Sequence, residues 1–249
     1  MATLPHPLSV RVLALVAVVL VAFATPAASA QMASDARANA PAAKPGTGIH
    51  FIYLIRHGVY DRDTTATDDR VSNGLNALGH EQARLIGERL AKLPIKFDRL
   101  ISSELLRAVQ TAADMNRAMK VTPARDELLN ECTPTSVSAS LMAGEKPEDV
   151  AECDSARVLA WQRYFVPTPE RDTYDVLACH GNVIRWDLMR ALGAETKYWS
   201  NQDVGHGSLS IIAVRPDSSI RVVMYSDVGH LPVDKQTWSG RGGGWVRRK

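Results

Sequence analysis

The sequence contains few cysteines and carries little net charge. Only 3 of its 249 residues are cysteines, too few for a scaffold built on disulfides, and no group of Cys and His residues has the spacing of a zinc site. Its 29 Lys and Arg residues nearly balance 27 Asp and Glu residues, so the formal net charge is +2, which argues against a nucleic-acid partner. With 45% hydrophobic residues, the chain can bury a hydrophobic core that is stable without disulfides or a structural metal. A metal-free globular enzyme or binding domain is therefore the starting class.

The apolar run near the amino terminus is short. Residues 12–24 follow Arg11 and carry no polar side chain, but as a helix they would span about 20 Å against a hydrocarbon core of about 30 Å. Small residues follow, which predicts a signal peptide over residues 1–30, cleaved after Ala30. Because no charged residue lies between Arg11 and Asp35, an uncleaved inner-membrane anchor is the alternative. We therefore expect an exported protein, periplasmic or secreted, or one tethered to the inner membrane.

Two further segments show no periodic spacing of apolar residues of the kind that marks a helix or a strand. Residues 31–48 are rich in Ala, Pro, Gly and Ser, which is typical of a flexible linker. Residues 236–249 are rich in Gly and end in Arg247-Arg248-Lys249, which predicts a disordered basic tail. One domain is expected between them, over residues 49–235.

Within this domain, short apolar runs alternate with segments of helical period. Buried parallel strands are expected at 51–55, 98–102 and 174–179, and helices at 76–93, 104–119 and 183–192. The β-rich segments 208–214 and 220–225 flank a turn-forming stretch and predict a hairpin. The pattern predicts an α/β fold, a three-layer α/β/α sandwich with a mostly parallel central sheet and an antiparallel pair near its end.

Basic residues stand where two of the expected strands end. His57 follows the first strand directly and is preceded by Arg56, His180 follows the third, and Arg107 comes shortly after the second. Ligands of such sheets bind at the carboxyl ends of the strands. Because a guanidinium group fits phosphate oxygens bidentately, these residues predict a cationic pocket for a phosphoryl group.

Four motifs in this order resemble the motif set of the histidine phosphatase superfamily, the phosphoglycerate-mutase-like proteins, in its first branch. They are Leu-Ile-Arg-His-Gly at 54–58, Leu-Asn-Ala-Leu-Gly-His-Glu-Gln-Ala at 75–83, the stretch 102–111 with Arg107-Ala108, and Cys-His-Gly-Asn-Val-Ile-Arg at 179–185. Within the family, the last motif and the ending at 227–232 most resemble the mitochondrial Ser/Thr protein phosphatases. The resemblance implies a phosphoglycerate-mutase-like fold over nearly the whole domain.

The resemblance also implies a mechanism without a metal or cofactor. His57 matches the family's nucleophile, which forms a phosphohistidine that water hydrolyses. Arg56, Arg107 and His180 match the residues that hold the phosphoryl oxygens and neutralise their charge. Glu131, in the loop after the next strand, matches the acid that protonates the leaving group and then deprotonates water.

Two further residues are candidates for substrate binding. Arg62 is expected at the mouth of the site, and Asn182 near the phosphate. The run Val59-Tyr60-Asp61-Arg62 departs from the family's mutases, so we expect hydrolysis of a phosphorylated small molecule or a phosphoprotein. A phosphate-binding module without turnover and a mutase-type phosphotransferase stay open as alternatives.

The cysteines suggest one more hypothesis. Cys179 lies in an expected buried strand, whereas Cys132 directly follows Glu131 and Cys153 begins a helical stretch. In an oxidising compartment, Cys132 and Cys153 could form a disulfide that fixes the loop of the acid. Free thiols remain the alternative.

Overall fold

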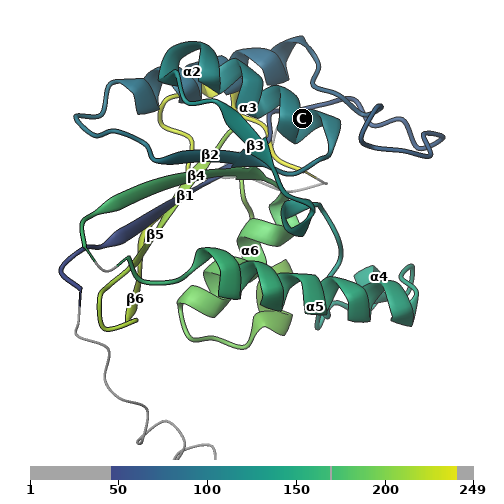
Figure 1. The fold of residues 1–249 in the computed structure, drawn as a ribbon. Coiled ribbons are helices and arrows are strands. Elements are labelled where there is room, and N and C mark those ends of the chain that lie inside the picture. The colour runs from purple at the N-terminus through teal and green to yellow at the C-terminus, as the bar shows by residue number, and fades with distance from the viewer. Residues whose placement is uncertain (1–45, 169, 240–249) are drawn as a thin grey trace, which may run out of the picture. The chain divides into compact units, whose positions relative to one another are not determined.

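A computed structural model describes residues 46–168 and 170–239, which form one mixed sheet between two layers of helices (Figure 1). The sheet has the order β3-β2-β4-β1-β5-β6. Its strands are β1 (His50–Arg56), β2 (Arg99–Ser102), β3 (Pro123–Arg125), β4 (Thr173–Cys179), β5 (Leu209–Val214) and β6 (Ile220–Asp227). The first four are mutually parallel, while β5 runs antiparallel to β1 and forms a hairpin with β6. The expected α/β sandwich with its late antiparallel pair is confirmed.

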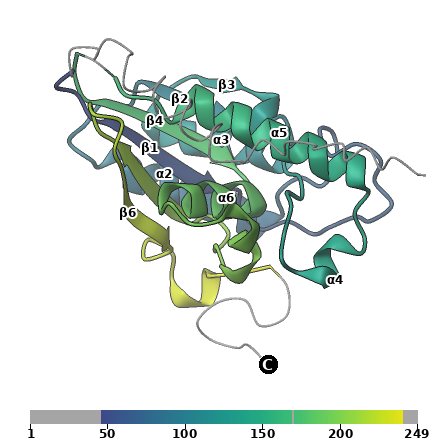
Figure 2. The same ribbon diagram turned by 90° about the horizontal axis from the view of Figure 1, so that it is seen from below.

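The helices cover both faces of the sheet. One layer consists of α2 (Ala77–Ala91) and α3 (Leu106–Met119). The other contains α5 (Pro147–Tyr164) and α6 (Gly181–Ala191), with the short α4 (Ala139–Met142), and Figure 2 views the molecule from this side. The 3-10 turns are η1 (Glu127–Leu129), η2 (Thr196–Asn201) and η3 (Val233–Lys235).

Strand β1 reads as a continuous apolar run because both of its faces are buried. Ile52 and Leu54 belong to the core beneath α5 and α6, whereas Tyr53 and Ile55 pack into the core beneath α2 and α3. A strand inside a sheet that is covered by helices on both faces needs apolar residues at every position. The same arrangement explains the run in β4.

Helix boundaries follow local chemistry. Asn76 caps α2 as expected, since its Oδ1 accepts a hydrogen bond from Gly79 N at 3.0 Å. Helix α5 begins at Pro147, with Glu148 and Asp149 in its first turn. Proline at the first helical position and acids in the first turn both favour a helix start. Cys153 therefore lies inside this helix and does not begin it.

The carboxyl-terminal residues 236–239 belong to the packed domain. The Gln236 side chain is buried and donates to Leu231 O at 3.0 Å, and Thr237 Oγ1 accepts from Gln82 Nε2 at 3.0 Å. Residues whose side chains are tied to the core in this way do not form a disordered tail, so the expected tail start at residue 236 is wrong.

The expected signal peptide (1–30), most of the linker (31–45) and the rest of the tail (240–249) lie outside the described residues. None of the helices within the described ranges combines the length and apolar character required to cross a lipid bilayer.

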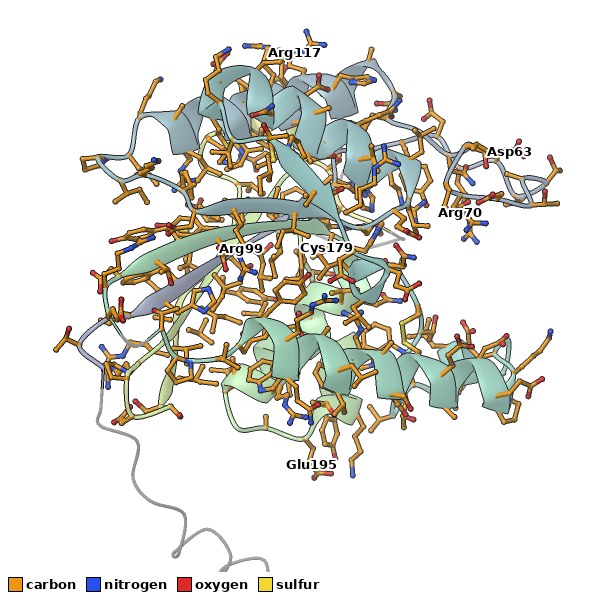
Figure 3. All side chains as sticks on the ribbon, in the orientation of Figure 1. Asp63, Arg70, Arg99, Arg117, Cys179 and Glu195 are labelled. Atoms are coloured by element: carbon orange, nitrogen blue, oxygen red, sulfur yellow. A yellow bond between two sulfur atoms is a disulfide. The ribbon has the colours of Figure 1, made fainter. Side chains whose placement is uncertain are left out.

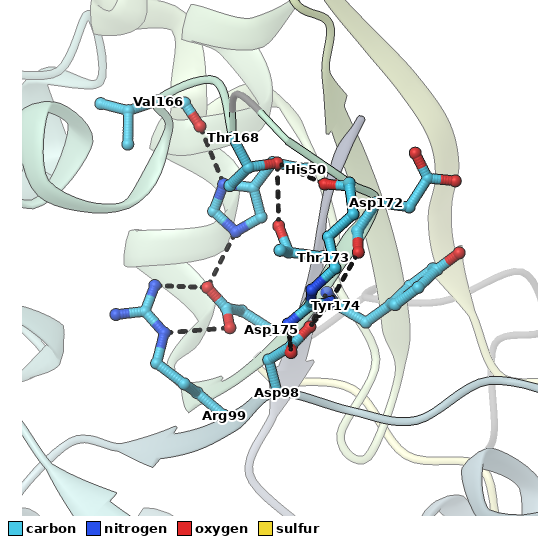
Figure 4. Close-up of polar contacts among 10 residues, drawn as sticks. His50, Asp98, Arg99, Val166, Thr168, Asp172, Thr173, Tyr174 and Asp175 are labelled. Atoms are coloured by element: carbon cyan, nitrogen blue, oxygen red, sulfur yellow. Dashed lines mark hydrogen bonds and ion pairs between the residues drawn. The ribbon is translucent and has the colours of Figure 1, made fainter. Parts of the chain in front are cut away.

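A buried ionic network ties the amino-terminal ends of the strands together (Figure 4). The side chain of Asp175 on β4 is 3% exposed and pairs with His50 Nε2 at 2.8 Å, and it accepts a hydrogen bond from Arg99 Nε at 3.0 Å. Burial by itself raises the pKa of Asp175, but the hydrogen bonds from His50 and Arg99 outweigh it and lower the pKa below its ordinary value. The network joins β1, β2 and β4 at the edge opposite His57.

We predict that Asp175→Asn lowers the free energy of unfolding at pH 7 by about 1–3 kcal/mol, because it removes the carboxylate partner of the buried His50 and of the half-exposed Arg99. Because the folded-state pKa of Asp175 lies below the unfolded value of about 3.9, its ionic contribution is present above that pH and is lost as pH falls through the folded-state pKa. Urea unfolding measured from pH 7 down to pH 3 should therefore show that the difference in free energy of unfolding between wild type and Asp175→Asn becomes smaller as the pH falls. The control variant Lys96→Ala, at an exposed position, should have a free energy of unfolding within about 0.5 kcal/mol of wild type at every pH. A difference that does not change with pH would contradict the ionic account.

Candidate active site

The sheet brings the two predicted histidines together. Arg56 pairs in register with Cys179 across β1 and β4, and His57 N donates to Cys179 O at 2.9 Å. The ring centroids of His57 and His180 lie 5.1 Å apart, and both side chains are buried. The expected convergence at the carboxyl edge of the sheet is therefore observed.

The contacts of His57 define where its proton lies. Nδ1 is 2.8 Å from Gly58 O, and because a carbonyl only accepts, Nδ1 carries the hydrogen and Nε2 keeps its lone pair. Burial lowers the pKa of His57 well below its usual value, and the nearby His180 and Arg56 lower it further. The ring is therefore neutral at neutral pH, with a nucleophilic nitrogen.

A cleft of about 380 Å³ opens beside His57. Six of the seven predicted site residues line it, namely Arg56, His57, Arg62, Arg107, Glu131 and Asn182. The seventh, His180, is fully buried next to His57. The loop from residue 61 to 74 reaches out past this edge of the sheet, as the labelled Asp63 and Arg70 show in Figure 3.

The two arginines are held by different partners. Arg56 donates to Val204 O and to Ser239 Oγ, and burial lowers its pKa to about 10, so it stays charged at neutral pH. Arg107 donates to Asp69 Oδ2 at 2.6 Å. The Nε groups of both arginines are buried and have no hydrogen-bond partner within the described part of the chain. Buried donors of this kind favour an anionic ligand.

His180 differs from the expectation in its charge. Burial lowers its pKa well below the usual value, and Arg107 and Arg56 lower it further. Its Nε2 lies 2.6 Å from Ser103 Oγ, and that oxygen accepts from Leu105 N at 3.2 Å. The hydroxyl hydrogen can then be donated to Nε2, which leaves the hydrogen of the ring on Nδ1. His180 therefore supplies a neutral donor and adds no positive charge.

Glu131 follows η1 and reaches the cleft from the α5 side. Burial raises the pKa of its carboxyl group, and Arg56 and Arg107 oppose this rise. Its Oε1 is buried without a hydrogen-bond partner among the described residues. A carboxyl group whose pKa is raised can hold a proton and transfer it, as acid catalysis requires.

The two substrate-binding candidates have different surroundings. Asn182 Nδ2 donates to Cys132 O at 2.9 Å, and its Oδ1 accepts from Arg185 Nη2 at 2.6 Å. Both ends of this amide are thus occupied by protein, and Asn182 supports the loop of Glu131. Arg62 is exposed at the mouth of the cleft, and its role in substrate binding stays a prediction.

Cys132 and Cys153 form a disulfide, whereas Cys179 is free and buried. The disulfide connects the loop of Glu131 to α5. The hypothesis that these two cysteines pair is confirmed in the structure.

Sequence reasoning missed several residues around His57. His206 lies with its ring centroid 5.7 Å from that of His57, and the Tyr60 ring stacks against Arg107 at 4.8 Å. Tyr60 lies two residues after the first motif, and its position could have drawn attention to it. Ser103 lies inside the motif at 102–111, whereas three further residues come from outside the recognised motifs: Asp69, His206 and Ser239.

Curated relatives resemble this chain over most of its length. It is 34% identical over 197 residues to the mitochondrial Ser/Thr-protein phosphatase PGAM5 of Xenopus tropicalis, covering 77% of this chain and 69% of the relative. Human PGAM5, also mitochondrial, is 34% identical over 194 residues, covering 76% and 66%. The Caenorhabditis elegans relative is 31% identical over 198 residues, covering 77% and 68%.

These relatives contradict the expected location. All three are mitochondrial proteins, so the prediction of export to the periplasm or beyond, with inner-membrane anchoring as its alternative, is wrong. A short apolar run with one positive charge and small residues is compatible with insertion into a membrane, but it does not specify which membrane.

Solved structures and a family model complete the comparison. Phosphoglycerate mutase from Plasmodium falciparum superposes with a TM-score of 0.53 at 23% identity, covering 75% of this chain and 96% of that one. Mycobacterial glucosyl-3-phosphoglycerate phosphatase does so with a TM-score of 0.52 at 20% identity, covering 72% and 99%. At these identities the likeness shows the fold.

The model of the histidine phosphatase superfamily (branch 1) matches residues 52–227, which include His57, Arg107, Glu131 and His180. The chain therefore belongs to branch 1 of the histidine phosphatase superfamily.

Proposed function

We propose that the protein hydrolyses phosphomonoesters through a phosphohistidine on His57. The observation that carries this proposal is the neutral ring of His57, whose Nε2 lone pair lies in a cleft shared with Arg56 and Arg107. Nε2 forms a bond to phosphorus while the bond from phosphorus to the ester oxygen breaks. Water then attacks the phosphohistidine, which releases inorganic phosphate and restores the imidazole.

The arginines stabilise the phosphoryl group during both steps. Their buried Nε groups can donate to its non-bridging oxygens, and charges in a buried site are screened less than charges in water. His180 adds a hydrogen bond from Nδ1 when Ser103 donates to Nε2. Asp69 and Tyr60 hold Arg107 in place.

Glu131 serves as the acid and then as the base. An alkoxide leaving group needs a proton as its bond to phosphorus breaks, and a carboxyl group with a raised pKa retains one to give. The resulting carboxylate then takes a proton from the attacking water.

We propose phosphoserine and phosphothreonine in proteins as the substrate class. The support is the similarity to relatives that are Ser/Thr-protein phosphatases and the exposed Arg62 at the mouth of the cleft, where it can contact a flanking acidic residue. Both substrates have alkyl leaving groups, which makes Glu131 essential for them.

The direct test is turnover of p-nitrophenyl phosphate and of a phosphoserine peptide in the presence of EDTA. His57→Ala should lower kcat/KM for both by at least about 1000-fold, since it removes the nucleophile. The partly exposed His80→Ala, on α2, should stay within about twofold. Quenching wild-type turnover in base should trap phosphate on His57, because phosphohistidine is labile in acid. Turnover without any trapped label, or equal rates in His57→Ala, would contradict the proposal.

The acid role predicts a dependence on the leaving group. Glu131→Gln should lower kcat/KM for the phosphoserine peptide by about 100-fold or more, whereas p-nitrophenyl phosphate should lose less than about tenfold because p-nitrophenolate leaves without a proton. Equal losses for the two substrates would show that Glu131 does not act as the acid.

A further inference from the structure

The residues before and around Glu131 form a segment without long regular structure, which we call the acid loop (residues 126–132). It contains η1, which ends at the extended Asn130, and then continues without regular secondary structure. A short segment of this kind does not fix its own position, so the location of the Glu131 carboxyl group depends on contacts with other elements.

Helix α5 holds the acid loop at several points. Before Glu131, Arg157 donates to Leu128 O, and Arg163 donates to Asp126 Oδ2 at 2.7 Å. Immediately after Glu131, the contact is the covalent bond between Cys132 and Cys153. Cys153 and Arg157 are four residues apart, so they lie on one face of the helix.

The remaining contacts after Glu131 are hydrogen bonds. Asn182 Nδ2 donates to Cys132 O at 2.9 Å, Trp199 Nε1 donates to Pro134 O at 3.1 Å and to Thr135 O at 3.2 Å, and Thr135 bonds to Asp154 on exposed atoms at 2.6 and 3.0 Å. Because consecutive Cα atoms are about 3.8 Å apart, a disulfide at Cys132 restricts the neighbouring Glu131 directly. The bonds to Pro134 and Thr135 act three and four residues along the chain, so they restrict Glu131 less.

The disulfide also faces a cleft of its own. A hollow of about 540 Å³ is lined by Cys132, Cys153 and Glu131. Glu131 lines the catalytic cleft as well, so the acid loop separates the two hollows. Cys153 is buried and Cys132 half-buried, so a small reductant approaches the disulfide from the Cys132 side of this hollow, without entering the catalytic cleft.

We propose that the Cys132–Cys153 disulfide positions Glu131, so that its reduction selectively disables hydrolysis of phosphate esters with poor leaving groups. This inference rests on the proposed role of Glu131 as the acid. A dithiol reductant supplies two electrons and two protons: the S–S bond breaks, thiols form at Cys132 and Cys153, and the reductant becomes a disulfide. The attack of His57 on phosphorus involves no cysteine and continues. Both cysteines are positioning residues, since neither touches the substrate.

The third cysteine does not take part in this exchange. Cys179 is fully buried inside the sheet, and burial raises the pKa of its thiol. A buried thiol with a raised pKa forms little thiolate and exchanges poorly. A response to reductant therefore belongs to the Cys132–Cys153 pair.

The test compares the oxidised and the dithiothreitol-reduced full chain on a phosphoserine peptide and on p-nitrophenyl phosphate, with the redox state verified by mass after alkylation. Reduction should lower kcat/KM for the peptide by about tenfold or more and for p-nitrophenyl phosphate by less than about threefold, and reoxidation should reverse both. Cys132→Ser/Cys153→Ser should behave like the reduced wild type and not respond to reductant. For Cys179→Ala, the ratio of kcat/KM with reductant to kcat/KM without it should equal that of wild type.

The outcomes separate the two proposals. Equal losses for both substrates on reduction would indicate general loosening of the fold, and no loss would show that the other contacts suffice; either result overturns the positioning role. If Glu131→Gln lowers kcat/KM more for the phosphoserine peptide than for p-nitrophenyl phosphate but reduction of the disulfide does not, only the inference about the disulfide fails. If Glu131→Gln shows no such dependence, the acid role fails first. In Glu131→Gln, reduction should not change the ratio of the two rates any further.

Discussion

The parallel pairing of β1 with β4 determines where the chemistry lies. With Arg56 opposite Cys179 in the register, the residue that follows each strand is a histidine, and both leave the sheet at one edge. A shift of one residue in this pairing would turn the side chains of β1 to the opposite faces of the sheet. The packing of the two cores resists such a shift, because each is fitted to different residues of β1, Ile52 and Leu54 on one face and Tyr53 and Ile55 on the other. The core and the catalytic geometry thus depend on the same register.

Burial then sets the electrostatics of the site. The chain as a whole is close to neutral, yet two buried arginines lie beside two buried histidines. Burial, together with the neighbouring positive charge, lowers the pKa of both histidines, so they lose their protons while Arg56 keeps its own. This division of roles gives one neutral nucleophile next to fixed cations. A dianionic phosphoryl group complements that arrangement, and in the proposed mechanism Glu131 supplies the proton that the leaving group needs.

Much of this could be predicted from the sequence, because buried strands and local motifs are local signals. The runs before His57 and His180 are continuous and apolar, and Asn76 is a typical helix cap. The features that could not be predicted depend on contacts between segments that lie far apart in the sequence. Strand β3 has only three residues and a largely exposed surface, which leaves no hydrophobic pattern to recognise.

Other features of the site were missed for the same reason. His206 and Ser239 come from segments with no period, and the fold alone brings them to Arg56. Charge is another property that composition does not reveal. The sequence suggested a cationic His180, but its complete burial beside two arginines makes it neutral.

The central claim is that His57 is neutral in the free enzyme, protonated on Nδ1 and available for attack at Nε2. The most direct measurement is ¹⁵N NMR of the enzyme with labelled histidine, with the His57 signals assigned through the His57→Ala variant and followed from about pH 5 to about pH 8, a range that spans the ordinary histidine pKa of about 6.5. A protonated Nδ1 and an unprotonated Nε2 are expected across the whole range. A His57 ring that takes up a second proton near pH 6.5, or one that carries its single proton on Nε2, would contradict it.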